Sequence, residues 1–309
     1  MTYILVLDQI VIMKGMSKIV LLVAAAVSGI FVLILGNNPL GGGDAVNTQD
    51  NNYNNQPVVS NRDRNTDVYP QSIDDNLPET GLNYIPTQQL GDQLIKYRYY
   101  ALSYSSQHQN AEWVAYELRG ARLDLAYRKE RKNFKSDPNI RTEASSLDYA
   151  NSGYDRGHLV PAHDMDFSEQ AIEESFYMTN VSPQVPDFNR GIWKRLEERV
   201  RTWAKKEQRL YIVTGPLLRS NVDAANRING NGPTIPRGFY KIVLDYEGPQ
   251  KKAIAFMFKN KEIQQPLENF VTTIDRVEAY TDLDFFPDLT EEEQAILEAT
   301  TNPEAWGFK

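Results

Sequence analysis

The middle of the chain carries side chains of the kinds that cut phosphodiester bonds. The segment opens with SGYDRGHLVPAHD, continues through FYMTNVSPQ and ends in DFNRGIWKRLEERV. In the DRGH tetrapeptide, Arg156 could hold a phosphate with a planar fork of donors, and His158 could take a proton from water near neutral pH. Amide and carboxylate oxygens, which suit Mg²⁺, are supplied by Asn180, Asn189 and Glu197. This segment therefore contains candidates for a base, a phosphate clamp and a metal site.

Each of these candidates also has an ordinary structural explanation. Asn180 follows an apolar run and precedes a Ser-Pro dipeptide, where an Asx-turn would account for it. Asn189 lies eight residues before Glu197. On a helix that spacing is ~80° of net rotation and ~12 Å of rise, so the two residues share a broad face without touching. Glu197 could hold a metal-bound water or orient Asn189, or it could be a surface residue.

Histidine is rare in this chain. The three histidines are His108, His158 and His163. His158 follows Arg-Gly in a polar, turn-prone context, which favours a functional position. A zinc site using His158, His163 and Asp164 is an alternative, although zinc sites use three or four protein ligands and supporting hydrogen bonds.

Charge is distributed unevenly along the chain. The net charge of −8 by itself disfavours a polyanionic substrate. Residues 261–309, however, contain 12 acidic and 3 basic residues, a net charge of −9, which leaves +1 for residues 1–260. Residues 190–209 carry 8 Lys and Arg against 3 Glu. The candidate site therefore adjoins a locally basic segment, although a solvated helix face has a similar composition.

The amino-terminal part has the composition of a membrane or export segment followed by a tether. Residues 19–36 form an uncharged run of 18 residues that follows Lys14 and Lys18, near the lower limit for a membrane-spanning helix. We expect residues 1–36 to be a membrane anchor that places the rest in the periplasm or outside the cell. Cleavage as a signal segment would make the protein secreted. Residues 37–90, rich in Asn, Gly, Asp and Gln, predict a flexible polar linker.

Residues 91–309 have the patterns of a folded domain with an acidic carboxy-terminal tail. Aromatic and β-branched runs predict strands at residues 95–104, 112–118, 208–215, 238–246 and 252–258. Helices are expected after Asp187 and at residues 267–280 and 290–300. This order predicts an α+β fold with a central mixed or antiparallel sheet flanked by helices. The chain has no cysteine, which excludes disulfides, thiolate metal sites and a cysteine nucleophile.

The segments SGYDRGHL, MTNVSPQ and FNRGIWKRLE together resemble the DNA/RNA non-specific endonucleases. This is the ββα-metal (His-Me finger) family, which includes endonuclease G and secreted bacterial sugar-non-specific nucleases. The resemblance covers residues 91–287 and implies the ββα-metal nuclease fold for the domain.

The resemblance also implies a role for each candidate residue. His158 would be the general base that activates water, and Asn189 would be the direct protein ligand of Mg²⁺, with Mn²⁺ as the alternative ion. Glu197 would bind water molecules on the metal. The other implied roles are phosphate support by Arg156 and Arg131, orientation of the motif loop by Asp155, and support of the site by Asn180.

The expected activity is therefore Mg²⁺-dependent, sequence-non-specific hydrolysis of DNA, RNA or both, which leaves 5′-phosphate and 3′-hydroxyl ends. Nucleic acid is the expected partner. We also expect the amino-terminal helix to attach the protein to a membrane. A homodimer and an inhibitor protein are left open. Two alternatives are a non-catalytic exported module that binds nucleic acid and the zinc hydrolase.

Overall fold

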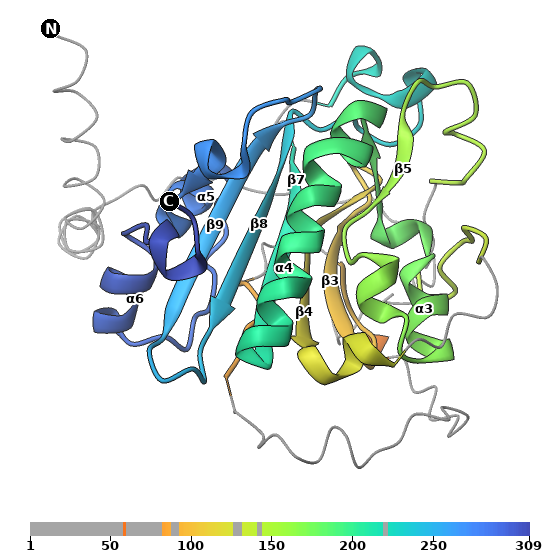
Figure 1. The fold of residues 1–309 in the computed structure, drawn as a ribbon. Helices are drawn as coiled ribbons and strands as arrows, with labels where there is room; N and C mark the ends of the chain where they lie inside the picture. Colours follow the sequence, from red (N-terminus) through yellow and green to blue (C-terminus); the bar gives the residue numbers. More distant parts are fainter. Residues whose placement is uncertain (1–57, 60–81, 88–92, 126–131, 141–143, 219–221) are drawn as a thin grey trace, which may run out of the picture. The chain divides into compact units, whose positions relative to one another are not determined.

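The computed structural model describes residues 58–59, 82–87, 93–125, 132–140, 144–218 and 222–309. Within these residues, an eight-stranded sheet runs in the order β1-β2-β3-β4-β7-β8-β9-β10 (Figure 1). Its strands are β1 (Val58–Val59), β2 (Gln93–Lys96), β3 (Tyr100–Ser105), β4 (Asn110–Arg119), β7 (Arg209–Leu217), β8 (Gly238–Asp245), β9 (Lys252–Lys259) and β10 (Val271–Thr272). All neighbours pair antiparallel except β1 and β2, which are parallel. The mixed sheet flanked by helices confirms the expected α+β class.

A separate two-stranded ribbon carries the DRGH motif. Strand β5 (Asp155–His158) pairs antiparallel with β6 (Val181–Gln184). The Ser182 hydroxyl donates to the Asn110 side chain over 2.7 Å, which ties the ribbon to β4.

The main sheet is buried on both faces. In β8, Phe239 and Val243 belong to one hydrophobic core, whereas Tyr240, Ile242 and Leu244 belong to a second. Side chains alternate between the two faces of a strand, so a strand covered on both sides reads as a continuous apolar run. That is why β7, β8 and β9 were visible in the sequence.

Helix α4 (Lys194–Glu207) crosses the first face of the sheet (Figure 1). Its buried residues, Leu196, Val200, Trp203 and Ala204, have the spacing of one helical stripe. The other helices are α3 (Glu169–Ser175), α5 (Ile274–Thr281) and α6 (Glu291–Leu297). Short 3₁₀ turns span Gly120–Asp124, Ala162–Met165, Met178–Asn180, Ala224–Asn226, Ile228–Gly230, Leu267–Phe270 and Pro303–Trp306.

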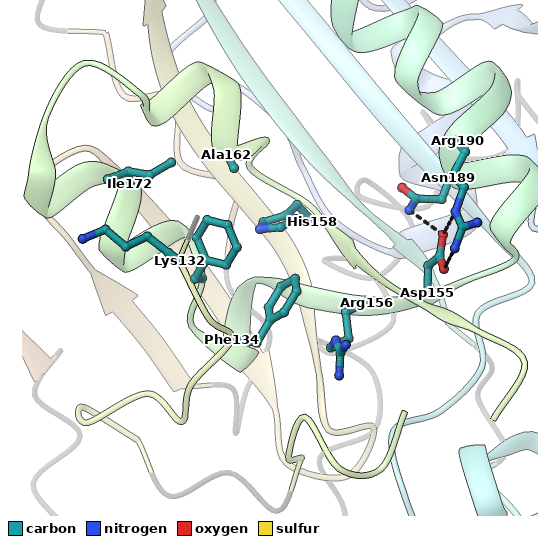
Figure 2. A pocket seen from close by; sticks show the side chains of 10 residues that line it. Lys132, Phe134, Asp155, Arg156, His158, Ala162, Ile172, Asn189 and Arg190 are labelled. Carbon is teal, nitrogen blue, oxygen red and sulfur yellow. Dashed lines mark hydrogen bonds and ion pairs between the residues drawn. The ribbon is translucent and has the colours of Figure 1, made fainter. Parts of the chain in front are cut away.

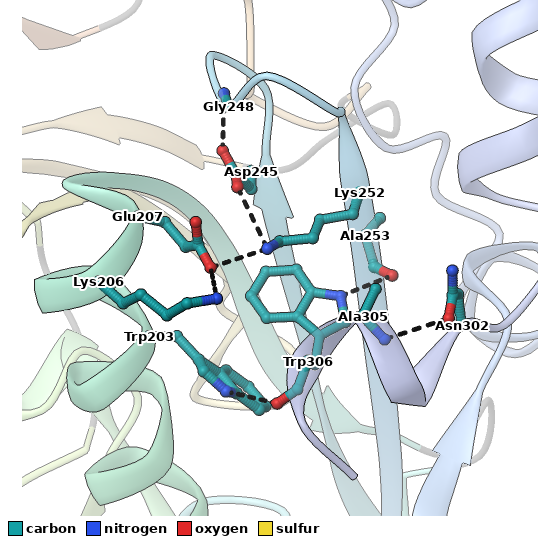
Figure 3. Close-up of polar contacts among 10 residues, drawn as sticks. All are labelled: Trp203, Lys206, Glu207, Asp245, Gly248, Lys252, Ala253, Asn302, Ala305 and Trp306. Atoms are coloured by element: carbon teal, nitrogen blue, oxygen red, sulfur yellow. Dashed lines mark hydrogen bonds and ion pairs between the residues drawn. The ribbon is translucent and has the colours of Figure 1, made fainter.

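The acidic carboxy-terminal segment is part of the folded domain. Ile274, Val277 and Leu297 of α5 and α6 lie in the second core. Trp306 closes the first core: its carbonyl accepts from Trp203 Nε1 over 2.9 Å, and its own Nε1 donates to the Ala253 carbonyl over 3.3 Å (Figure 3).

Several predicted elements need correction. Residues 95–104 are not one strand but the hairpin β2–β3, because the chain turns back at residues 97–99. Strand β7 does not stop at Gly215-Pro216 but continues to Leu217, paired with β8. The helix expected at 267–280 starts only at Ile274, after a 3₁₀ turn and β10.

The amino-terminal expectations fall mostly outside the described residues. This holds for the segment 1–36 and for most of the linker 37–90. The end of that linker is ordered within the fold: Leu82, Tyr84 and Ile85 pack against the second core, and Thr87 N donates to the Asp284 carbonyl over 2.9 Å. In the part of the chain that the structure describes, no helix has the length and apolar character to cross a membrane.

Candidate active site

Two adjoining cavities form a cleft beside the β5–β6 ribbon and the start of α4. Their volumes are about 570 Å³ and about 550 Å³. His158, Ala162, Asn189 and Arg190 line both, so these residues lie where the cavities meet. The first cavity (Figure 2) is also lined by Lys132, Phe134, Asp155, Arg156, Ile172 and Phe176. The second is also lined by Pro161, His163, Lys194, Glu197 and Arg201.

Strand β5 places Arg156 and His158 on one face of the ribbon. Because alternate residues of a strand share a face, the two side chains project together, and both contact Phe134. The Arg156 guanidinium lies 5.2 Å from the Phe134 ring centre, and its Nη1 donates to the Ser146 carbonyl over 2.9 Å. The His158 ring lies 5.0 Å from Phe134 and 4.9 Å from Phe176, edge-on to the latter. Aromatic packing therefore sets the direction of the imidazole.

Asp155 joins the DRGH motif to the segment that carries Asn189. Asn189 Nδ2 donates to Asp155 Oδ2 over 3.0 Å, and Arg190 donates to both carboxylate oxygens over 2.7 and 2.9 Å. Burial works against ionisation of Asp155, but the hydrogen bonds from Arg190 and Asn189 outweigh it and lower the pKa of the carboxyl. The Asn189 amide oxygen consequently faces the side of the cleft that holds His158 (Figure 2).

The segment from Asn189 to Glu197 is not the straight helix that the sequence predicts. Residues Phe188–Trp193 form a π-helical turn in which Gly191 has φ −98° and ψ −106°. Helix α4 begins only at Lys194. A π-turn widens the helix locally and often marks a functional site. Here it lets Asn189 reach Asp155 while Trp193 stays in the core.

Glu197 lines the second cavity and interacts electrostatically with a buried lysine, Lys241. Burial raises the pKa of Glu197 to about 7, although Lys241 opposes the shift. Burial lowers the pKa of Lys241 to about 8, and Glu197 in turn opposes that shift. The Lys241 ammonium is fully buried, 4.9 Å from the Trp193 ring centre, and has no hydrogen-bond partner among the described residues.

Asn180 does not line the cleft but is hydrogen-bonded to the backbone next to it. Its Oδ1 accepts from Val160 N over 2.9 Å, and its Nδ2 donates to the carbonyls of Val160 and Ser175. The Asx-turn that was considered as the structural alternative does not explain Asn180, because the partner of Oδ1 lies 20 residues away. Asn180 ties β6 to the chain that leaves β5.

The zinc ligands considered from the sequence do not come together. The Asp164 carboxylate is buried and accepts from the Tyr116 hydroxyl over 2.9 Å and from Arg201 over 3.0 Å. Within the described ranges, His158, His163 and Asp164 do not form a group with metal-binding spacing.

Comparison with known proteins now gives the family. A sequence model described as DNA/RNA non-specific endonuclease matches residues 78–292. The chain is 31% identical to mitochondrial endonuclease G of Homo sapiens over 209 residues, 64% of this chain and 70% of that one. It is 34% identical to Nuclease C1 of Cunninghamella echinulata var. echinulata over 205 residues, 62% of this chain and 81% of that one. This chain belongs to the DNA/RNA non-specific endonuclease family. It is a nuclease.

A solved structure supports the same assignment for this nuclease. A chain from the crystal structure of the EndoG/EndoGI complex, which concerns the mechanism of EndoG inhibition, superposes with a TM-score of 0.61 at 28% identity. The alignment covers 67% of this chain and 90% of that chain.

Sequence reasoning missed two cations, Arg190 in the candidate cleft and the fully buried Lys241, and could not be checked at a third position. Arg190 stands directly after Asn189 in the quoted motif, so its position was the available signal. Lys241 is a single lysine within the apolar run of β8, which is the pattern of a buried charge. Arg131, proposed from the sequence as a phosphate contact, lies outside the described residues; its neighbour Lys132 lines the first cavity.

Proposed function

We propose that this nuclease hydrolyses DNA, RNA or both with Mg²⁺, without sequence preference, and leaves 5′-phosphate and 3′-hydroxyl ends. The observation that carries the proposal is that His158 and Asn189 line the same two adjoining cavities. A single phosphate bound in these cavities would therefore lie near both the base and the metal ligand.

His158 is the proposed general base. Its ring is held between Phe134 and Phe176 at the junction of the cavities, where a water molecule beside a bound phosphate could reach it. The imidazole must be neutral to accept the proton of that water, so activity should fall in acid.

Asn189 is the proposed protein ligand of Mg²⁺, and its surroundings fit that role. The bond from Nδ2 to Asp155 leaves Oδ1 as the amide atom on the side of the cleft. Oxygen ligands suit Mg²⁺, and Mn²⁺ is the alternative, because these ions bind proteins through few groups and keep several waters. When bound, the ion would supply Lewis acidity to the phosphate and its leaving oxygen. Glu197, in the adjoining cavity, would accept hydrogen bonds from metal-bound waters.

Arg156 and Arg190 are the proposed phosphate contacts. Both line the first cavity with Lys132, and guanidinium groups hold phosphate oxygens without reading the base. Such contacts support cleavage that depends on the backbone and tolerates many sequences. A nuclease of this kind would endanger nucleic acid in its own cytoplasm, so we also propose that residues 1–36 anchor or export it. Fractionation of cells that express chains with and without these residues tests this.

The proposal is tested by His158→Ala, assayed on plasmid DNA and on RNA with Mg²⁺. Loss of a general base should lower kcat by ~10²- to 10⁴-fold. His158→Gln keeps a polar side chain of similar size between Phe134 and Phe176, so it separates loss of the base from loss of packing. It should lose as much activity as His158→Ala. Unchanged activity in both variants would refute the role of His158.

His163→Ala is the matched control, because His163 is an exposed histidine that lines only the second cavity. It should retain most of the activity, whereas a zinc hydrolase would lose activity equally at both histidines. An absence of cleavage by the unaltered chain with Mg²⁺, Mn²⁺ or Ca²⁺, together with retained binding, would favour the non-catalytic alternative.

A further inference from the structure

A second group of acidic side chains gathers away from the nuclease cleft. Asp275 and Glu278 stand three residues apart on α5, so they share one helix face. Glu298 directly follows the last residue of α6. One carboxylate oxygen of each residue lies within 4.8 Å of the other two. Among the described residues, no other set of three His, Cys, Asp or Glu side chains is so arranged.

Glu298 is an unusual member of this group because it is buried. Its exposed fraction is only 4%, and its Oε1 has no hydrogen-bond partner among the described residues. Leaving a charged carboxylate buried and unpaired is costly, so such a group takes up either a proton or a cation. Burial raises the pKa of Glu298 to about 8, and the acidic neighbours Glu278, Asp275 and Asp284 add to the shift.

The fold holds the three carboxylates in place. Asp275 N donates to the Glu298 carbonyl over 3.2 Å, which joins the first turn of α5 to the end of α6. Glu278 Oε1 accepts from Phe285 N over 2.9 Å, which fixes its side chain against the next loop. Asp275 is exposed and Glu278 half-buried, so one side of the group is open to water.

We propose that Asp275, Glu278 and Glu298 bind a calcium ion at a site separate from the nuclease cleft. The donors are all carboxylate oxygens, which favours Ca²⁺, Mg²⁺ or Mn²⁺ over zinc, because zinc sites are built mainly on histidine nitrogen and cysteine sulfur. Three carboxylates with an open side for water suit Ca²⁺, which takes six to eight oxygen ligands in flexible geometry. Mg²⁺ binds through one or two carboxylates in a stricter octahedron, so it should bind less well.

The ion would tie α5 to α6 over the second core. Ile274, Val277 and Leu297, the buried neighbours of the three ligands, pack there, whereas the active-site helix α4 packs on the first core. Ca²⁺ should therefore act on the stability of the domain, because it neutralises a group of like charges.

Proton and cation should compete for the site. Ca²⁺ binds the carboxylate form of Glu298, so the ion and a proton on this buried side chain exclude one another.

The test is thermal unfolding of the full chain, freed of metal, at a pH above 8 with CaCl₂ from zero to ~10 mM, a range that reaches weak calcium sites. The melting temperature should rise with Ca²⁺ by mass action. Glu298→Gln keeps the size of the side chain, removes its charge, and should abolish the rise. Asp275→Asn, at an exposed position, provides the same test if Glu298→Gln does not fold.

Glu292→Gln is the matched control, because it removes one exposed glutamate from the first turn of the same helix α6. It should retain the Ca²⁺-dependent rise. The reference chain and every variant in this experiment also carry Asn189→Ala. This substitution prevents Ca²⁺ bound at the proposed nuclease site from contributing to the melting temperature. The proposal is overturned if Ca²⁺ fails to raise the melting temperature of the Asn189→Ala chain, or raises it equally in the Glu298→Gln and Glu292→Gln variants.

Discussion

Asp155 is the residue on which the geometry of the cleft depends. It is part of the DRGH motif, and its carboxylate binds the π-turn at Phe188–Trp193. There it accepts from Asn189 and Arg190 at once. One carboxylate thus orients the proposed metal ligand and a proposed phosphate contact. The lowered pKa of Asp155 shows that the folded site favours the charged form.

Asp155→Asn should reduce kcat/KM by ~10- to 100-fold, the usual cost of losing a group that orients a metal ligand. The amide is the same size, but its NH₂ would face a donor of Asn189 or Arg190 in either orientation. Stability should change little, because Arg190 is exposed and the ion pair lies near the surface.

Plasmid cleavage and thermal unfolding measure the two effects. Asp124→Asn is the control, since it also removes a carboxylate paired with a cation, Lys205, but lies outside the cleft. Full activity in Asp155→Asn would show that Asn189 is oriented by other contacts.

At the scale of elements, the β5–β6 ribbon depends on a close approach at Gly157. A β-carbon on Gly157 would lie 2.2 Å from Gln184 Cδ and Oε1. Gln184 is fully buried on the facing strand, so its side chain has little room to move. The glycine of the motif therefore leaves room for the buried side chain of Gln184 next to the proposed base.

Gly157→Ala should destabilise the protein by ~1–3 kcal/mol, the typical cost of overpacking, and should lower the activity by displacing His158. Gln184→Ala in the same chain should recover part of both losses, because it removes the atoms that clash. Chemical denaturation of the two single variants and the double variant measures the coupling. Strictly additive effects would mean that the contact with Gln184 does not explain the glycine.

At the scale of the whole molecule, much of the acidic charge lies away from the cleft. The acidic residues of 261–309 include those on α5 and α6, which cover the second core, whereas Arg156, Arg190 and Lys194 line the cleft. Salt screens charges beyond ~8–10 Å, so a phosphate in the cleft responds chiefly to the local cations. The net charge of −8 is therefore compatible with a polyanionic substrate.

The activity should fall steeply as salt increases between ~50 and 200 mM, because each phosphate contact releases counterions. Arg156→Ala should reduce the slope of log(kcat/KM) against log[salt] by about one. Lys206→Ala, an exposed lysine of α4 outside both cavities, should leave the slope unchanged. An unaltered slope in Arg156→Ala would remove that residue from the phosphate contacts.

Local patterns in the sequence determined the class of fold, the family and most of the candidate residues. The strands at residues 238–246 and 252–258 were predicted because each is a continuous apolar run, and the DRGH segment was visible as a motif of neighbouring residues. These signals depend on residues close together in the chain, which is what periodicity and motif spacing report.

Only the tertiary structure decided how distant residues meet. It revealed the π-turn that brings Asn189 to Asp155, the lysine of β8 beneath Glu197, and the convergence of Glu298 with Asp275 and Glu278. None of these contacts has a local signature, because each depends on which faces of the sheet and helices pack together. The packing of the two hydrophobic cores determines which faces meet. It thereby determines where each polar group lies relative to the others.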